Sequence, residues 1–324
     1  MILVTGATGF LGATLTRQLL EGGQSVRILR RQQSKLDLLG EAVESVEHAI
    51  GDVTDYPAVR AAMEGIQHVY HSAAYVGFGG KKDKARLTDV NVRGTANVAD
   101  AANEARVERM VHVSSIAAIG RKHGQHEPID ETCEWSVSKE NSAYAMSKHM
   151  AEMEIHRAIA EGLDAVMVNP SVIFGPGRTG ENTMTIVEKV RNGRVPAIPS
   201  GGTSVVDVED VASGIRAAME HGANGERYIL GGENLAWAQI FGALADALDA
   251  RLPRLTLTRG PALAMGALSE TLARLIRVTP PITRETARTS TSTYRYDNRK
   301  AVEQLGCVFR PFKETAERVA STMR

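Results

Sequence analysis

The chain has 324 residues, enough for one large domain or for a large and a small one, each with its own buried core. Its 38 Lys and Arg residues balance 38 Asp and Glu residues, which excludes a global positive field that would draw it onto nucleic acid. Cys133 and Cys307 cannot build a disulfide framework, and neither stands at metal-ligand spacing from a His or a second Cys. We therefore expect a cytoplasmic protein with a small-molecule partner, no metal and no nucleic acid.

The first half alternates short β-branched runs with helical patterns. The chain begins with the strand-like run Ile2 to Val4 and has no cationic and apolar leader, so we do not expect secretion. Apolar residues such as Leu11, Leu15 and Leu19 follow at helical spacing. Further strands are expected at residues 25–29, 46–50, 68–71, 110–113 and 165–168. This alternation predicts an α/β fold of the Rossmann type, with a doubly wound parallel sheet and crossover helices.

The second half changes texture after Asn169. A stretch rich in Gly and Pro runs to Gly202, and helical patterns dominate from Leu235. Because residues 205–220 again look like a strand-to-helix unit and residues 226–230 like another strand, we expect the chain to re-enter the first domain. The predicted boundaries are 1–170 for a cofactor-binding domain, re-entered by about 204–232, and 171–203 with 233–324 for a substrate lobe.

Residues 261–278 form the most apolar stretch of the second half. Ser269, Glu270, Arg274 and Arg277 interrupt it, so it lacks the roughly 18 uncharged residues of a membrane span. We expect an amphipathic packing helix, part of a substrate lid, with interfacial membrane contact as the alternative.

A glycine loop joins the first strand to the first helix. Gly6 can make the tight turn, Gly9 can let the backbone approach a pyrophosphate, and Gly12 can let helix and strand pack closely. The alternative is an ordinary strand-to-helix turn. The position of the loop at the start of an alternating chain favours dinucleotide binding by Thr5, Gly6, Thr8, Gly9, Phe10, Leu11 and Gly12.

The end of the second strand favours NADP over NAD. NAD-binding folds place an acidic residue about 20 positions beyond the glycines to bind the ribose hydroxyls, and here Arg30 and Arg31 stand instead. Guanidinium groups can hold a 2′-phosphate that a carboxylate would repel. The alternative is that both arginines lie on a solvated strand end, with NAD as the cofactor.

Two further segments fit the same cofactor site. Asp52 can accept a hydrogen bond from an adenine amino group and Val53 can pack on its ring, although a plain turn is the alternative. Ser72, Ala73 and Ala74 follow the fourth strand with small side chains, where a ribose or nicotinamide needs close approach of the backbone.

Tyr144 and Lys148 stand four residues apart in a strong helical pattern, so they share one helix face. An unperturbed phenol has a pKa of about 10 and needs help to exchange protons near neutrality; Lys148 and an oxidised nicotinamide ring can give it. Ser115 ends the fifth strand, at the edge where open α/β sheets bind ligands, and can donate to a substrate oxygen. A packed tyrosine beside a surface lysine is the alternative for the pair alone.

With these elements together, the chain closely resembles the extended short-chain dehydrogenase/reductase family, in its NAD-dependent epimerase/dehydratase group. Its dihydroflavonol-reductase-like and hydroxysteroid-dehydrogenase-like members are the most similar. The resemblance covers nearly the whole chain and rests on the sequence motifs at residues 5–12, 51–55, 91–95, 113–115, 144–148 and 169–177. It implies that Ser115, Tyr144 and Lys148 are catalytic, that Lys148 also holds the nicotinamide ribose, and that Asn91 is a structural support. The resemblance further implies that three residues lie beside the nicotinamide ring: Pro170, Ser171 and Val172.

Three functions remain after this resemblance. The first is an NADP(H)-dependent oxidoreductase that reduces a ketone or aldehyde, because Ser115-Ile116-Ala117 lacks the acid pair expected of a sugar dehydratase. The second is a nucleotide-sugar epimerase with tightly bound NAD. The third is an NADP-responsive binding module, which would have little need of intact catalytic residues. The epimerase would need basic residues directed into its pocket, for which the candidates are Arg178, Lys189, Arg191 and Arg194. The alternative for these four residues is a solvated helix face.

The substrate pocket is the least readable part of the sequence. Apolar residues near the expected site indicate an apolar carbonyl or alcohol as substrate, with core packing as the alternative for each residue. The candidates are Tyr75, Phe78, Ile119, Met146, Phe174 and Met184. The resemblance also implies a homodimer through helices near residues 83–105 and 143–160.

Overall fold

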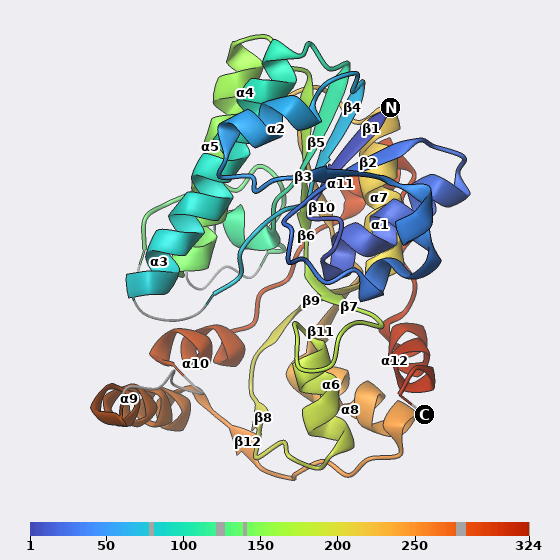
Figure 1. Cartoon of the computed structure of the whole chain (residues 1–324). Helices are drawn as coiled ribbons and strands as arrows, with labels where there is room; N and C mark the ends of the chain where they lie inside the picture. Colours follow the sequence, from blue (N-terminus) through green and yellow to red (C-terminus); the bar gives the residue numbers. More distant parts are fainter. Residues whose placement is uncertain (78–80, 121–126, 139–140, 277–282, 324) are drawn as a thin grey trace.

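The computed structural model describes residues 1–77, 81–120, 127–138, 141–276 and 283–323. Its centre is a parallel sheet with the strand order β10-β6-β5-β4-β1-β2-β3, flanked by helices on both faces (Figure 1). The strands are β1 (Ile2–Thr5), β2 (Val26–Arg30), β3 (Glu47–Ile50), β4 (His68–His71), β5 (Arg109–Val113), β6 (Ala165–Pro170) and β10 (Arg227–Leu230). The predicted doubly wound Rossmann-type fold is confirmed.

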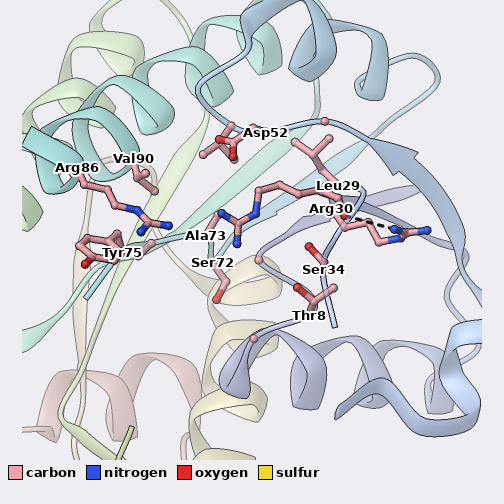
Figure 2. Close-up of a pocket in the computed structure, with 16 residues that line it drawn as sticks. Thr8, Leu29, Arg30, Ser34, Asp52, Ser72, Ala73, Tyr75, Arg86 and Val90 are labelled. Carbon is pink, nitrogen blue, oxygen red and sulfur yellow. Dashed lines mark hydrogen bonds between the residues drawn. The ribbon is translucent and has the colours of Figure 1, made fainter. Parts of the chain in front are cut away.

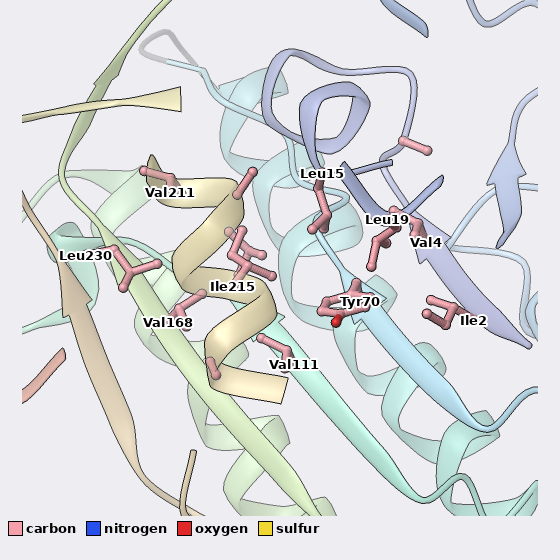
Figure 3. Packing of buried hydrophobic residues seen from close by; sticks show 14 of the residues in the cluster. Ile2, Val4, Leu15, Leu19, Tyr70, Val111, Val168, Val211, Ile215 and Leu230 are labelled. Atoms are coloured by element: carbon pink, nitrogen blue, oxygen red, sulfur yellow. The ribbon is translucent and has the colours of Figure 1, made fainter. Parts of the chain in front are cut away.

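One hydrophobic cluster lies between the sheet and the helices of one face. Leu15 and Leu19 of α1 and Ile215 of α7 pack on strand residues such as Val4 and Val111 (Figure 3). The inner strands β1 and β6 are largely apolar, because helices cover both faces of the sheet. The helices of this face are α1 (Phe10–Glu21), α7 (Val208–His221) and α11 (Arg299–Leu305).

A second cluster fills the opposite face of the sheet. Leu3, Met110 and Met167 point to this side of their strands, and Val98 and Ile155 meet them from the helices. Ser142 caps the long helix α5 by accepting a hydrogen bond from the backbone N–H of Ala145 at 2.9 Å. The elements of this face are α2 (Tyr56–Ala62), α3 (Lys81–Leu87), a π-helical segment (Thr88–Arg93), α4 (Gly94–Glu104) and α5 (Ala143–Ala160).

The second lobe lies beyond the carboxyl ends of the central strands (Figure 1). A small sheet in the order β11-β9-β7 joins it to the central domain, and Phe174, Ile240 and Phe312 are in its own hydrophobic cluster. Its strands are β7 (Val172–Phe174), β8 (Ile198–Pro199), β9 (Gly202–Asp207), β11 (Glu233–Ala236) and β12 (Thr256–Leu257). Its helices are α6 (Met184–Arg191), α8 (Trp237–Leu248), α9 (Arg259–Ile276), α10 (Arg284–Thr291) and α12 (Phe312–Ser321).

The chain returns to the central domain through α7 and β10. β10 pairs with β6 at the edge of the large sheet, whereas β9 pairs with β7 and β11 of the small one. Within the segment expected to re-enter, residues 204–232, β9 therefore belongs to the small sheet and β10 to the large one. Asp207, at the junction, accepts a hydrogen bond from the N–H of Glu209 at 2.8 Å and so starts α7.

Candidate active site

Two adjoining cavities open at the carboxyl ends of the central strands. The smaller has a volume of about 240 Å³ and runs along the ends of β1, β2, β3 and β4. The larger has about 640 Å³ and lies between the glycine loop, the ends of β5 and β6, and the second lobe. Gly6 and Gly9 line both cavities, so together they form one cleft of the kind that doubly wound sheets present to a dinucleotide.

The glycine loop is tightly packed at two of its three glycines. Gly6 has a φ of +72°, and a Cβ there would lie 2.6 Å from the backbone nitrogen of Ala73. A Cβ on Gly12 would lie 2.2 Å from the carbonyl oxygen of Gly6. Gly9 begins α1 without a side-chain cap, so the first amides of the helix remain available to a phosphate. Thr5 supports the loop by binding Nδ1 of His71 at 2.7 Å.

Arg30 and Ser34 line the smaller cavity (Figure 2). Arg31 lines it as well. No sequence pattern distinguishes Ser34. The Nε atom of Arg30 donates to Nδ1 of His48 at 2.8 Å, which holds this guanidinium beside β3. Arg31 is exposed. The end of β2 thus presents cations and a hydroxyl to the cavity.

Asp52 and Val53 also line the smaller cavity. The Oδ1 atom of Asp52 accepts hydrogen bonds from the backbone N–H and the hydroxyl of Thr54, at 3.0 and 2.9 Å, so this carboxylate also stabilises the turn. Val53 is buried and packs against Gly94, where a Cβ would approach it to 2.8 Å. The small residues after β4 line the cleft as well: Ser72, Ala73 and Ala74.

Ser115, Tyr144 and Lys148 line the larger cavity together. Burial raises the pKa of Tyr144, and a hydrogen bond with Ser115 opposes part of that rise. Ser115 begins a short 3₁₀ turn (Ile116–Ala118) and accepts a hydrogen bond from the N–H of Ala117 at 3.1 Å. The tyrosine therefore holds its proton at neutral pH beside a second hydroxyl.

Lys148 is buried, with its Nζ atom 2.7 Å from the carbonyl oxygen of Val113. Burial lowers the pKa of Lys148 to about 8, and the carboxylate of Glu152, one turn along α5, opposes part of this shift. Glu152 accepts a hydrogen bond from Asn169 at 2.7 Å, and Asn169 also donates to the carbonyl of Ser115 at 2.9 Å. A buried polar network thus links the ends of β5 and β6 to α5.

Asn91 has the supporting place that the resemblance implies. Its side chain is buried and forms hydrogen bonds with both the N–H and the carbonyl of Tyr75, at 2.7 and 2.9 Å. It also donates to the hydroxyl of Ser147 on α5 at 2.9 Å. Asn91 therefore ties the loop after β4 to the helix that carries Tyr144 and Lys148.

The candidate substrate residues have different positions. Tyr75 lines the smaller cavity, where its hydroxyl donates to Asp83 at 2.9 Å and Arg86 lies over its ring (Figure 2). Phe78 lies outside the described residues. Met146 is partly buried on α5 and is not among the residues that line either cavity. The other three are in hydrophobic clusters away from the cavity surface: Ile119, Phe174 and Met184.

The predicted nicotinamide segment enters the larger cavity through Pro170 and Ser171, while Val172 pairs with Val205 in the small sheet. The hydroxyls of Ser114 and Ser171 are buried without a hydrogen-bond partner among the described residues. Two orphaned hydroxyls at a cleft leave donors for a bound ligand. Thr8 lines the smaller cavity, and Phe10 and Leu11 line the larger.

Several lining residues were not expected from the sequence. Arg86 and Val90 reach the smaller cavity, and the second lobe and the loop after β4 contribute to the larger one. No local pattern distinguishes these positions, because they meet the glycine loop only through long-range packing. The unexpected lining residues of the larger cavity are Val76, Ile173, Glu181, Asn182, Thr183 and Ile186.

The sequence model of the NAD dependent epimerase/dehydratase family matches residues 2–231 of the chain. A putative dihydroflavonol 4-reductase of Synechocystis is 35% identical over 94% of this chain and 88% of its own length. Sterol demethylase protein B of Methylococcus capsulatus is also 35% identical, over 94% of this chain and 93% of its own length. The crystal structure of gox2253 superposes with a TM-score of 0.85 and 34% identity, over 99% of this chain and 97% of that one.

The fold is of the Rossmann type, with a cleft at the carboxyl ends of its central strands. The chain belongs to the NAD-dependent epimerase/dehydratase family of the extended short-chain dehydrogenases/reductases, as its sequence motifs imply. This membership and its reductase relatives support an oxidoreductase that uses a nicotinamide cofactor. Among the described residues, no group of three or more His, Cys, Asp or Glu side chains could hold a metal ion.

Proposed function

We propose that the protein is an NADPH-dependent reductase that converts an apolar ketone or aldehyde to its alcohol, with Tyr144 as the proton donor. The observation that carries the proposal is the shared cavity: Tyr144, Ser115 and Lys148 line the same cleft as the glycine loop. A proton donor and a dinucleotide-binding glycine loop in one cleft are suited to hydride transfer coupled to protonation.

The cleft fits a nicotinamide dinucleotide. Gly6 and Gly12 leave no room for a side chain, and the first amides of α1 face the same opening. Pro170 and Ser171 would lie beside the nicotinamide, with Lys148 at its ribose. When bound, this cofactor supplies the hydride.

The protein residues supply the proton and the alignment. Tyr144 keeps its proton at neutral pH, since the ordinary pKa of a phenol is about 10 and burial raises that of Tyr144 further, so it can donate to a carbonyl oxygen that gains negative charge. Ser115 holds the phenol by a hydrogen bond and offers a hydroxyl to the same oxygen. A charged Lys148 would stabilise the phenolate that remains after transfer.

The preference for NADPH rests on the end of β2. Arg30, Arg31 and Ser34 border the smaller cavity where an NAD-binding fold would place a carboxylate. Guanidinium and hydroxyl groups suit a 2′-phosphate. The preference for reduction follows from this, because NADPH is a cofactor that a reductase exchanges in every cycle.

The apolar substrate rests on the lining of the larger cavity. Phe10, Val76, Ile173 and Ile186 contribute apolar surface around Tyr144. Relatives named as reductases include cinnamoyl-CoA reductases and a 2-alkyl-3-oxoalkanoate reductase. Arg178, which a nucleotide-sugar epimerase could use, instead bonds Asp37 at 2.7 Å and the carbonyl of Thr8 at 3.0 Å.

The test is a fluorescence titration of purified protein with NADPH and with NADH, followed by turnover on a panel of aryl and alkyl ketones and aldehydes. We expect tighter binding of NADPH and net consumption of it with at least one carbonyl. Preference for NADH, or NAD retained through purification together with interconversion of a nucleotide sugar, would contradict the reductase and favour the epimerase.

A further inference from the structure

The helix α9 packs through its small residues. It lies at the outer edge of the second lobe beside α10, which it contacts more than any other element (Figure 1). Its buried positions include Ala262, Gly266 and Ala273. At Gly266 the contact is closest, because a Cβ there would lie 2.8 Å from the backbone nitrogen of Arg284.

The large apolar residues of α9 face outward instead. Met265, Leu268 and Leu272 are 44%, 60% and 51% exposed, and their spacing of three and four residues puts them on one face. Pro261 and Ala264 are exposed on the same face. A surface helix of a globular protein normally buries such residues, so this apolar stripe (residues 261, 264, 265, 268 and 272) indicates a partner that covers it.

The stretch of sequence that contains this helix is strongly basic. Residues 251–295 contain eight arginines and no lysine or aspartate, against Glu270 and Glu285, which gives a formal charge of +6 in a chain whose total is zero. Arg251 and Arg254 are exposed just before β12, next to Leu255, which is 63% exposed. Apolar and basic surface thus occur together in this part of the second lobe.

Charge distinguishes the possible partners. A second copy that met this face symmetrically would bring two copies of this basic segment together, which opposes association. A substrate lid would require residues of α9 at the cleft, and none of the α9 residues whose side chains the structure describes lines either cavity. An anionic bilayer complements both the arginines and the apolar stripe.

We propose that α9 is an interfacial helix that binds the surface of an anionic lipid bilayer. The apolar stripe enters the boundary between headgroups and acyl chains, and the exposed side chains of Arg251 and Arg254 lie at the phosphate level. No helix in the described part of the chain has the length and apolar character needed to cross a bilayer. The helix therefore lies on the membrane and holds the second lobe against it.

The test is cosedimentation of the full chain with vesicles of phosphatidylcholine alone or mixed with phosphatidylglycerol, without cofactor or substrate. We expect binding to the anionic vesicles, about tenfold weaker binding to the neutral ones, and loss of binding at high salt. The double variant Leu268→Gln/Leu272→Gln should bind the anionic vesicles at least about tenfold more weakly. The matched control is Val137→Gln/Val308→Gln, which changes two valines that are 84% and 83% exposed elsewhere.

Unchanged melting temperatures would verify that the α9 variant is folded. The proposal is overturned if the wild type does not bind anionic vesicles. It is also overturned if the α9 variant binds them as well as the control variant does. A dimer in analytical ultracentrifugation that this variant dissociates, without vesicle binding, would assign the stripe to a second copy and also overturn it. The readout needs no turnover, so it succeeds or fails independently of the reductase activity.

Discussion

The Nζ atom of Lys148 donates a hydrogen bond to the carbonyl oxygen of Val113, 2.7 Å away at the end of β5. The ammonium is thereby held in a buried position beneath the cleft, where burial lowers its pKa to about 8. Its ordinary pKa is 10.5, so between these values the unfolded chain binds more protons than the folded one. The stability of the cofactor-free protein therefore gains from Lys148 as the pH rises.

The variant Lys148→Met lacks this pH-dependent contribution to the free energy of unfolding. Raising the pH from 8 to 10 should increase the free energy of unfolding of the wild type by about 2 kcal/mol relative to the variant. Denaturant unfolding of both proteins at the two pH values measures the difference. Equal changes in the two proteins would show that the pKa of Lys148 is not lowered.

Gly6→Ala tests the fit of the glycine loop. Gly6 and Gly23 have similar φ values, +72° and +74°, but a Cβ on Gly23 would meet nothing within 4 Å. Gly23→Ala should cost about 1 kcal/mol for the left-handed backbone, and Gly6→Ala should cost about 2 kcal/mol more because its Cβ would strike Ala73. Thermal or denaturant unfolding compares them. Equal losses would contradict the close approach of the two loops.

The variant His112→Leu should lose less free energy of unfolding than the wild type when the pH is lowered. His112 is buried beside His71 with no hydrogen-bond partner among the described residues, and burial holds the pKa of His112 well below its usual range. The unfolded chain binds a proton there as the pH falls through about 6.5, so stability is lost on acidification. Between pH 6.5 and 5.5 the wild type should lose about 1 kcal/mol more than the variant. Denaturant midpoints at these two pH values test this, and identical slopes would refute it.

Arg31→Ala tests the preference for NADPH. Arg31 is exposed at the cleft, whereas Arg30 is already bound to His48, so Arg31 is the freer of the two to meet a 2′-phosphate. Loss of one charge-assisted contact should weaken NADPH binding about tenfold. NADH binding should change little, which makes NADH the internal control in the same titration. A parallel loss for both cofactors would place Arg31 outside phosphate recognition.

The sequence predicted the features that depend on local pattern. The strands of the central sheet, the glycine loop and the face shared by Tyr144 and Lys148 follow from apolar periodicity and short spacings. These signals also place Ser115 at the carboxyl edge, because parallel strands end together. The family motifs added the supporting place of Asn91.

The rest depends on which distant segments meet. Phe174 looks like a pocket residue by position, but β7 turns it toward Phe312 of α12. Glu152 and Asn169 are 17 residues apart and meet only because α5 packs beside β6. The outward stripe of α9 has the same apolar pattern as a buried face, and only its packing partner shows which side is covered.

The most direct test of the proposed reductase is Tyr144→Phe, with Tyr56→Phe on the distant helix α2 as the matched control. Loss of the proton donor should lower kcat on an accepted carbonyl by about 10² to 10⁴ while NADPH binding, measured by fluorescence, stays within about twofold. Tyr56→Phe should leave both unchanged. A Tyr144→Phe enzyme that turns over at the wild-type rate would contradict the role of Tyr144 and with it the proposed mechanism.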